Sequence, residues 1–294
     1  MRIAVTGHEG QVARSLAERA STRDRVVVIT VGRPLLDLTR PETIMPALAS
    51  VQPDIVVSAA AFTAVDQSED EPDIAYAINE GGARAVAEAA ANLGIPVIHL
   101  STDYVFDGRS ERPYTEDDLP APQSVYGASK LAGENAVAEA NPRHLILRTA
   151  WVYSPFGQNF VKTMLRLASE RGEISVVADQ CGNPTSALDI ADAILHVANA
   201  LGRERPEPWG IYNVAGAGVT NWADLARHVL SASREHGGPY AQVLDIATSQ
   251  YPTKARRPAS SRLATDKITS SFGWSAPEWR ASVRAVVHRL VVRP

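Results

Sequence analysis

The sequence predicts an α/β fold in which a doubly wound parallel sheet is followed by a smaller C-terminal lobe. An apolar strand pattern at residues 2–6 runs directly into a glycine-containing turn and a helix. Short apolar strands and helical segments then alternate up to about residue 150, a pattern typical of parallel sheets. Beyond that point the regularity loosens. We therefore expect a first domain over residues 1–150, to which some later segments return. Residues 151–294 are expected to form mainly the second lobe.

Composition and charge narrow the class of protein. The chain has 294 residues, of which 45% are hydrophobic, and its net charge is −4 without a basic stripe, so nucleic acid is not an expected partner. No apolar run reaches the ~18 residues of a membrane helix. Residues 1–6 are already strand-like, so we expect no signal peptide. Cys181 is the single cysteine, which indicates a reducing compartment; we expect a cytoplasmic protein.

The turn after the first strand has the pattern of a dinucleotide-binding loop. Gly7 permits a tight turn, and Gly10 lets the backbone approach a pyrophosphate. Gln11 and Val12 open the following helix, whose N-terminal N–H groups and positive dipole end suit phosphates. Ala13 stands where a third glycine often keeps helix and strand close. The first domain is therefore predicted to be a Rossmann-like NAD(P)-binding domain.

The end of the second strand, residues 26–31, bears on the choice of cofactor. An acid there favours NAD by binding the ribose 2′-hydroxyl, but this strand is followed by Gly32 and Arg33. Arg33 is suited to a 2′-phosphate, which favours NADPH while leaving NADH open. Asp37 and Leu38 begin the next turn and are predicted to border the adenine.

The next elements continue the alternation of strand and helix. Thr39 is placed to cap a helix over 41–51, and the strand 55–58 runs into Ala61-Phe62-Thr63. Small residues at the carboxyl end of a parallel strand leave room for a ligand. The elements that we expect next are helix 73–93, strand 96–100, loop 109–123, helix 125–140 and strand 144–150.

The second half is predicted to be less regular. An extended loop over 176–185 follows a first helix, and a turn-rich basic loop spans 251–258. The regular elements expected here are helices over 157–171, 187–201 and 220–234, the last capped by Thr220 or Asn221, a strand over 210–214, and a final helix near 277–290.

Tyr126 and Lys130 lie four residues apart and so share one helix face. A free tyrosine has a pKa of ~10, and a nearby ammonium favours the phenolate. We expect Lys130 to lower the pKa of Tyr126, which then exchanges a proton with a carbonyl oxygen. Thr102, at a strand end ~24 residues earlier, is placed to hydrogen-bond the same oxygen. Lys130 is also within expected reach of the nicotinamide ribose.

Together these motifs resemble the extended short-chain dehydrogenases/reductases and, more narrowly, the dTDP-4-dehydrorhamnose reductases among them. The resemblance covers nearly the whole chain. Beyond the glycine turn and the tyrosine–lysine pair, it depends on the segments Ala59–Asp66, Ser101–Gly108, Arg148–Tyr153, Asn159–Val161, Asp179–Thr185 and Arg257–Ser261.

The resemblance implies reduction of the C4 ketone of dTDP-4-dehydro-β-L-rhamnose to dTDP-L-rhamnose by NADPH or NADH. It implies a catalytic trio of Thr102, Tyr126 and Lys130, with Tyr126 as proton donor. From the motifs and the resemblance together, the residues that we expect to bind the cofactor are Gly7, Gly10, Gln11, Val12, Arg33, Asp37, Leu38, Ala61, Phe62, Thr63, Tyr126 and Lys130. Those implied to bind the sugar nucleotide are Thr102, Asp103, Tyr126 and Trp151.

Several alternatives stay open. The same fold serves sugar-nucleotide 4-epimerases, reductases of opposite C4 stereochemistry, and non-enzymatic regulatory subunits. Some relatives form homodimers around magnesium, so a homodimer is a candidate assembly. The metal is an open question, because no compact carboxylate cluster in the sequence establishes a site.

Overall fold

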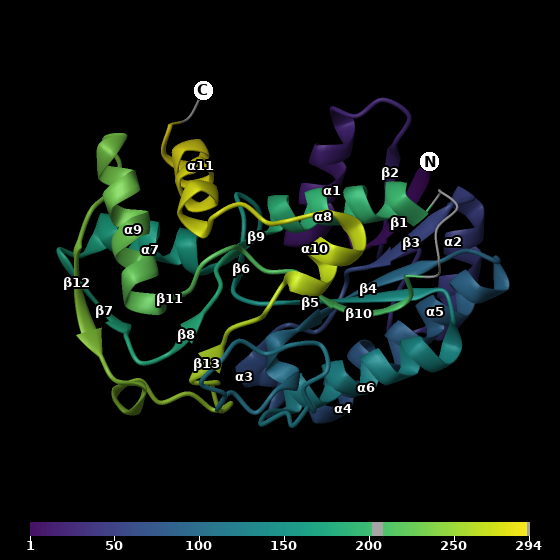
Figure 1. Cartoon of the computed structure of the whole chain (residues 1–294), viewed down its shortest axis with the longest axis horizontal. Helices are drawn as coiled ribbons and strands as arrows, with labels where there is room; N and C mark the ends of the chain where they lie inside the picture. The colour runs from purple at the N-terminus through teal and green to yellow at the C-terminus, as the bar shows by residue number, and fades with distance from the viewer. Residues whose placement is uncertain (202–207, 293–294) are drawn as a thin grey trace.

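The computed structural model describes residues 1–201 and 208–292. Its centre is a six-stranded sheet in the order β10-β5-β4-β3-β1-β2, in which every neighbouring pair is parallel (Figure 1). Because β1 lies between β2 and β3, the order of strands reverses there, and ligands bind such sheets at this switch point. The strands are β1 (Arg2–Thr6), β2 (Val27–Val31), β3 (Ile55–Ser58), β4 (Val97–Thr102), β5 (His144–Thr149) and β10 (Gly210–Asn213).

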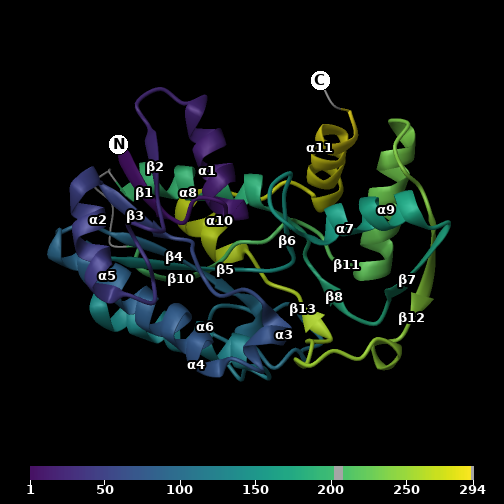
Figure 2. The same cartoon turned by 180° about the vertical axis from the view of Figure 1, so that it is seen from behind.

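Helices cover both faces of this sheet, which confirms the predicted doubly wound α/β fold (Figures 1 and 2). One face packs its apolar side chains against α1 (Gln11–Ser21), α8 (Ala187–Leu201) and α10 (Asp266–Phe272). The other packs against α2 (Ile44–Val51), α5 (Ala83–Asn92) and α6 (Val125–Ala140). The central strands are continuous apolar runs because both of their faces are buried, whereas the edge strand β2 is mostly half-buried.

The helix expected over 73–93 contains a π-helical segment. It consists of α4 (Pro72–Tyr76), the π-helix η2 (Ala77–Gly82) and α5. Asn79 lies in this π-helix with its side chain 1% exposed, and π-segments of this kind often occur at functional sites. The backbone carbonyl oxygen of Asn79 would lie 2.1 Å from a Cβ at Gly133, so the glycine lets α6 approach η2 closely.

A second apolar core lies beside the sheet and belongs to the later part of the chain. It is formed by α7 (Phe160–Glu170), α9 (Trp222–Glu235), α11 (Trp279–Val291) and the parallel pair β7 (Glu173–Val177) with β12 (Gln242–Ile246). Meanwhile α8, β10 and α10 return to the first core. These two cores give the molecule the two-part outline seen in Figure 1.

Short elements connect the two parts. The pair β6 (Val152–Tyr153) with β9 (Thr185–Ser186), and the three-stranded set β11 (Thr220–Asn221), β8 (Cys181–Gly182) and β13 (Ser260–Ser261), lie between the sheet and the second core (Figures 1 and 2). The remaining short elements are the 3-10 helices η1 (Pro41–Thr43), η3 (Asp103–Val105) and η4 (Thr248–Gln250), and the single turn α3 (Val65–Ser68).

Some local predictions are wrong. Thr39 does not cap a helix: its hydroxyl donates to Asp37 Oδ1 at 2.8 Å, and the helical run opens at Pro41 as 3-10 turn η1. The helix expected from residue 157 begins at Phe160, because Asn159 caps it by accepting from Lys162 N. The loop expected over 176–185 contains the end of β7 and two short strands, and both β12 and α10 were not predicted. By contrast, α8 has the predicted bounds and Asn221 caps α9.

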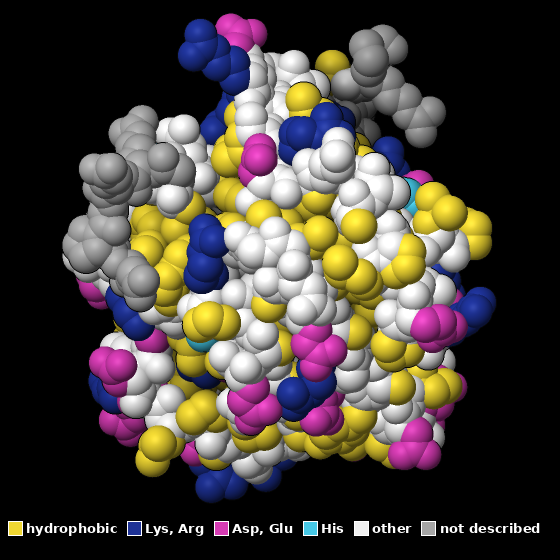
Figure 3. Space-filling model, turned by 90° about the vertical axis from the view of Figure 1, so that its right-hand side faces the viewer, with side chains coloured by type: hydrophobic (Ala, Val, Ile, Leu, Met, Phe, Trp, Pro, Cys, Tyr) yellow, Lys and Arg dark blue, Asp and Glu magenta, His cyan; other side chains and the backbone are white. Residues whose placement is uncertain are grey.

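The described residues contain no helix that is long and apolar enough to cross a membrane. On the face shown in Figure 3, hydrophobic side chains cover broad areas of the centre, and basic and acidic side chains are mixed toward the lower part and the edges.

Candidate active site

The carboxyl ends of the parallel strands bring the predicted site residues to one edge of the sheet. Gly7 follows β1, Arg33 follows β2, and Ala61 follows β3. Thr102 ends β4, and its register partner on β5 is Thr149, two residues before Trp151. The sheet topology therefore brings segments between residues 7 and 151 to one edge of the sheet. Arg33 lies farthest to one side, because it follows the outermost strand, β2.

The glycine turn fits a bound pyrophosphate. Gly7 has φ +91°, a left-handed conformation that favours glycine. A Cβ built on Gly10 meets no atom within 4 Å, so the space beside it is open. Gly10 is the N-cap of α1, and no side chain caps that helix end. The amides of Gln11 and Val12 are thus available to phosphate oxygens.

The end of β3 is held next to this turn. Thr6 Oγ1 accepts from the backbone N–H groups of Ala59 and Ala60, at 3.0 and 2.9 Å. Further along, Phe62 N donates to Asn79 Oδ1 at 2.8 Å, and Asn79 Nδ2 donates back to Phe62 O at 3.1 Å. The segment Ala61-Phe62-Thr63 therefore has a fixed backbone, and its side chains are half-buried or exposed.

The residues assigned to the adenosine end of the cofactor have different environments. Arg33 is exposed just beyond β2. Asp37 accepts hydrogen bonds from the N–H and hydroxyl of Thr39, which, with a smaller effect of the nearby Arg33 charge, lower the pKa of its carboxyl. Leu38 is buried and packs against Gly82, where a Cβ would lie 2.7 Å from the leucine Cβ. The side chain of Leu38 thus belongs to the core and leaves only its backbone for a ligand.

The N-terminus of α6 sets the position of Tyr126. Ser124 caps the helix by accepting from Gly127 N at 3.1 Å. A Cβ on Gly127 would lie 2.2 Å from the carbonyl oxygen of Tyr104, so only glycine lets α6 pack this closely on η3. As a result the rings of Tyr104 and Tyr126 meet edge to face with centroids 5.5 Å apart, beside Thr102.

The Tyr126 phenol is in a desolvated environment. Burial raises its pKa above the ordinary value, a hydrogen bond with Thr102 acts in the opposite direction, and the charge of Asp103 raises it further. Lys130 does not lie against the phenol. The expected lowering of the Tyr126 pKa by Lys130 is therefore wrong for this structure, in which burial dominates.

Lys130 is itself buried, with 3% of its surface exposed. Its Nζ donates to Leu100 O at 2.7 Å and lies 3.2 Å from His99 Nε2. Burial lowers the pKa of Lys130 to about 8, while Glu134, one helical turn further on, opposes this change.

Asp103 lies next to Thr102 and is 4% exposed. Its Oδ1 accepts from Thr102 Oγ1 at 3.1 Å, and its Oδ2 has no hydrogen-bond partner among the described residues. Burial raises the pKa of the Asp103 carboxyl to about 6, against the smaller lowering effects of Ser261 and Thr102. An unpartnered buried carboxylate oxygen at this edge is suited to accept a hydroxyl proton from a ligand.

Trp151 has a strained backbone, with φ +49°, at the end of β5. Its ring stacks on Trp222 with centroids 3.6 Å apart, and Trp222 Nε1 donates to Gln180 Oε1 at 3.2 Å. A Cβ on Gly182 would lie 2.6 Å from the Trp151 indole, so the glycine gives that ring its place. Trp151 thus links the sheet edge to the segment 179–185.

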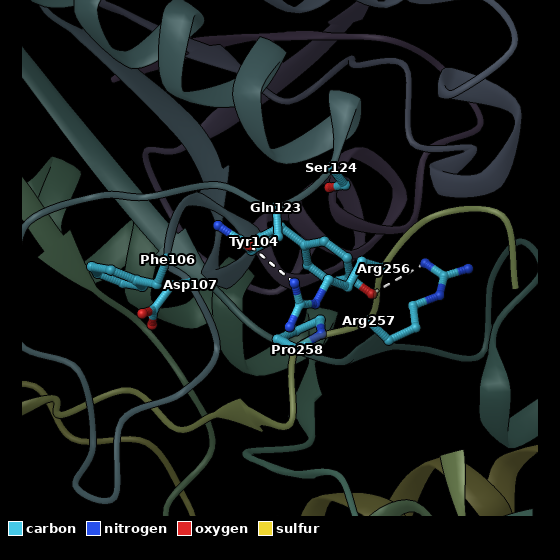
Figure 4. A pocket seen from close by; sticks show the side chains of 8 residues that line it. All are labelled: Tyr104, Phe106, Asp107, Gln123, Ser124, Arg256, Arg257 and Pro258. Carbon is cyan, nitrogen blue, oxygen red and sulfur yellow. Dashed lines mark hydrogen bonds between the residues drawn. The ribbon is translucent and has the colours of Figure 1, made fainter. Parts of the chain in front are cut away.

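The basic loop 251–258 reaches the same edge from the second part of the chain. Arg257 donates to Asp66 Oδ2 at 2.6 Å and to the Tyr104 hydroxyl at 3.2 Å. A pocket beside this contact is lined by Tyr104, Phe106, Asp107, Gln123, Ser124, Arg256, Arg257 and Pro258 (Figure 4).

Sequence reasoning missed several residues that order the site. Tyr104, His99 and Glu134 contact or face the predicted catalytic residues. The available signal for His99 was its position inside the otherwise apolar strand 97–100, where a buried polar side chain needs a partner. Among residues 1–201 and 208–292, no group of three or more His, Cys, Asp or Glu side chains is placed to hold a metal ion.

Comparisons with known proteins agree with this geometry. The family model described as RmlD substrate binding domain matches residues 1–292. The dTDP-4-dehydrorhamnose reductase of Sinorhizobium fredii is 52% identical over 99% of this chain and 98% of its own. A crystal structure of a dTDP-4-dehydrorhamnose reductase from Clostridium acetobutylicum has a TM-score of 0.92 at 35% identity, over 99% of this chain and 100% of that one. Another, from Bacillus anthracis in complex with NADP, has a TM-score of 0.88 at 35% identity, covering 97% and 98%.

The parallel sheet, the glycine turn and the tyrosine–lysine helix define a member of the extended short-chain dehydrogenases/reductases. Full-length matches to both sequences and structures narrow this class. The chain belongs to the dTDP-4-dehydrorhamnose reductase family.

Proposed function

We propose that this protein reduces the C4 ketone of dTDP-4-dehydro-β-L-rhamnose to dTDP-L-rhamnose, with a nicotinamide dinucleotide as hydride donor. The observation that carries the proposal is the placement of the Tyr126 phenol beside Thr102 at the carboxyl edge of the sheet, with Lys130 on the next turn of α6. Family membership supplies the substrate class.

Tyr126 acts as the proton donor in this proposal. Reduction of a ketone requires a proton at the oxygen as hydride reaches the carbon, which the dihydronicotinamide supplies. The Tyr126 phenol, whose pKa is raised by burial, is protonated at neutral pH and so carries the proton that the ketone oxygen requires. The Thr102 hydroxyl orients the same oxygen, and Lys130, with a pKa of about 8, places a positive charge near the reacting groups.

For the cofactor, we propose NADPH in preference to NADH. The glycine turn and the amides of α1 hold the pyrophosphate, and Ala61-Phe62-Thr63 lines the nicotinamide side. Arg33 is exposed beyond β2, with no carboxylate at that strand end, and provides a guanidinium for a 2′-phosphate. Asp37 stays ionised, because the hydrogen bonds from Thr39 lower the pKa of its carboxyl, and both of those bonds are accepted by Oδ1.

We also propose that residues 1–150 form the cofactor domain and that residues 151–294 contribute mainly the substrate lobe. The separate apolar core of the later chain supports this division. In the sugar site, Asp103 accepts from a sugar hydroxyl through its unpartnered Oδ2, and the Trp151 ring packs on the sugar. A homodimer stays a prediction that light scattering can measure, and we propose no metal site.

The decisive experiment incubates the purified chain with dTDP-4-dehydro-L-rhamnose and either NADPH or NADH. We expect cofactor oxidation, followed by absorbance, and a product identified by NMR as the L-rhamnose sugar nucleotide. Conversion without net cofactor consumption would identify an epimerase. A product with the opposite C4 configuration would identify the other reductase, and no turnover with either cofactor would overturn the proposed enzyme activity.

A further inference from the structure

His99 is a polar side chain in a strand that is otherwise buried in the apolar core. It lies on β4 between Ile98 and Leu100 and is 1% exposed. Its two ring nitrogens both have partners: Nδ1 lies 3.1 Å from Ser58 Oγ on β3, and Nε2 lies 3.2 Å from Lys130 Nζ on α6. The imidazole therefore bridges a neighbouring strand and the helix that carries Tyr126.

The direction of these hydrogen bonds follows from charge. Burial, followed by the charge of Lys130, holds the pKa of His99 well below its ordinary value, so the ring is neutral. A lysine ammonium has only donors, so Nε2 must accept from Lys130. The single ring proton then lies on Nδ1 and is donated to Ser58 Oγ.

Two protein acceptors thus fix the Lys130 ammonium. One of its three N–H groups goes to Leu100 O at 2.7 Å and one to His99 Nε2. The third is available to the site. Leu100 and His99 are adjacent on β4, two and three residues before Thr102, so the lysine is held by the strand that carries the other catalytic hydroxyl.

The charged and titratable groups around Lys130 are few. On α6 itself, Glu134 lies one turn further on and Tyr126 one turn before. On β5, Arg148 is paired with Glu134. Among the described residues, His99 on β4 is the titratable side chain that lies within hydrogen-bond distance of Lys130 Nζ.

We propose that His99 is a positioning residue, which holds the ammonium of Lys130 toward the reacting groups by accepting one of its hydrogen bonds through Nε2. This inference rests on the proposed function only for its effect on turnover. Its physical basis is independent of the substrate: a hydrogen bond to the charged form of a buried group stabilises that form.

The chain permits a direct test that needs no turnover. Its lysines occur only at positions 130, 162, 254 and 267, so NMR with lysine labelled at the side-chain carbon gives four signals. Lys→Arg substitutions at positions 162, 254 and 267 assign them. We expect the Lys130 signal of the unsubstituted protein to titrate near the pH of about 8 that its burial indicates.

Three substitutions at position 99 separate hydrogen bonding from packing. His99→Leu removes both ring nitrogens. His99→Gln places an amide oxygen near the position of Nε2, whereas His99→Asn keeps a hydrogen-bonding amide only on the Ser58 side, where its N–H can donate. We expect the Lys130 midpoint to fall by about one pH unit in the Leu and Asn variants and to return toward the original value in the Gln variant.

We expect the same ranking of the position-99 variants in the kinetics. With sugar nucleotide and NADPH, kcat should fall about 10-fold or more in His99→Leu and His99→Asn, while KM changes little, and the alkaline limb of the kcat profile should move to lower pH. His99→Gln should recover most of kcat. His144→Leu is the matched control, since His144 lies on β5 and bonds to Asn141 O at 2.7 Å.

Equal Lys130 midpoints in the Gln and Asn variants, or a midpoint unchanged from the original in both, would overturn the inference even if the protein reduces its ketone normally. Absence of turnover in the unsubstituted protein would overturn the proposed function instead, and the NMR titration would still decide the role of His99. If His99→Leu does not fold, the comparison of Gln with Asn carries the test.

Discussion

Glu134 of α6 and Arg148 of β5 form an ion pair in the interior of the protein, with Arg148 Nη2 2.6 Å from Glu134 Oε2. Each side chain is 2% exposed. Arg148 Nε donates to the other carboxylate oxygen at 2.9 Å, and Ser101 also donates to it. Since Ser101 is the register partner of Arg148, this pair fastens the catalytic helix to the two strands that end at Thr102 and Thr149.

Breaking that pair should be costly. Arg148→Met leaves the Glu134 carboxylate buried without a counterion, and we expect a loss of about 3–5 kcal/mol in the free energy of unfolding, measured with urea. The double variant Glu134→Met with Arg148→Met should recover a large part of this loss. The exposed pair Arg166–Glu170 is the control: Arg166→Met should cost at most about 0.5 kcal/mol. Similar losses of stability in Arg148→Met and Arg166→Met would contradict the buried-pair argument.

Tyr126→Phe should remove the proton donor while preserving the ring packing on Tyr104. We expect kcat to fall about 10²–10⁴-fold with little change in NADPH affinity, because the phenol contributes mainly in the transition state. Steady-state kinetics and fluorescence titration of NADPH measure the two effects. Tyr104→Phe is the comparison variant, since its hydroxyl contacts Arg257. Near-normal turnover in Tyr126→Phe is incompatible with the assigned role.

Arg33→Ala should change cofactor choice. Loss of the guanidinium should raise the Kd for NADPH about 10-fold and leave that for NADH nearly unchanged, since only the former has a 2′-phosphate to pair with arginine. Calorimetric titration with both cofactors measures this ratio. Arg40→Ala, an exposed arginine paired with Glu42, is a matched surface control. Equal effects on both cofactors would remove Arg33 from the proposed 2′-phosphate site.

The stability of the protein should depend on the ionisation of Asp103. Burial raises the pKa of its carboxyl to about 6, from an ordinary value of 3.8. The folded chain therefore binds more protons than the unfolded chain between those values, so the Asp103 contribution to stability falls as pH rises through this window. Asp103→Asn should then stabilise the protein by about 2–3 kcal/mol at pH 8 and by much less near pH 4.

Urea unfolding of the unsubstituted protein and Asp103→Asn at both pH values tests this expectation. A stability difference that is the same at pH 4 and pH 8 contradicts a raised pKa. The variant should also bind the sugar nucleotide more weakly, since an amide cannot replace both acceptor oxygens of the carboxylate.

Local patterns predicted the first part of the chain well. The apolar strands at residues 2–6 and 55–58 have the predicted bounds, because strands buried on both faces leave continuous apolar runs between turn residues. Local patterns failed for β7 and β12, which are only five residues long and each bury few side chains, so neither leaves a continuous apolar run. Thr39 illustrates another limit: a residue suited to capping bonded instead to Asp37, two residues away.

The sequence by itself determined the fold class, the glycine turn, and the spacing that places Tyr126 and Lys130 on one face of a helix. These features depend on neighbours within a few residues. Only the tertiary structure decided the surroundings of that pair, because these come from β3, β4 and β5, up to 72 residues from Lys130 in the case of Ser58. Burial, rather than the helical neighbour, sets the pKa of Tyr126, and His99 with Leu100 sets the direction of Lys130. Desolvation and long-range hydrogen bonds are properties of the packed chain, so a local pattern cannot contain them.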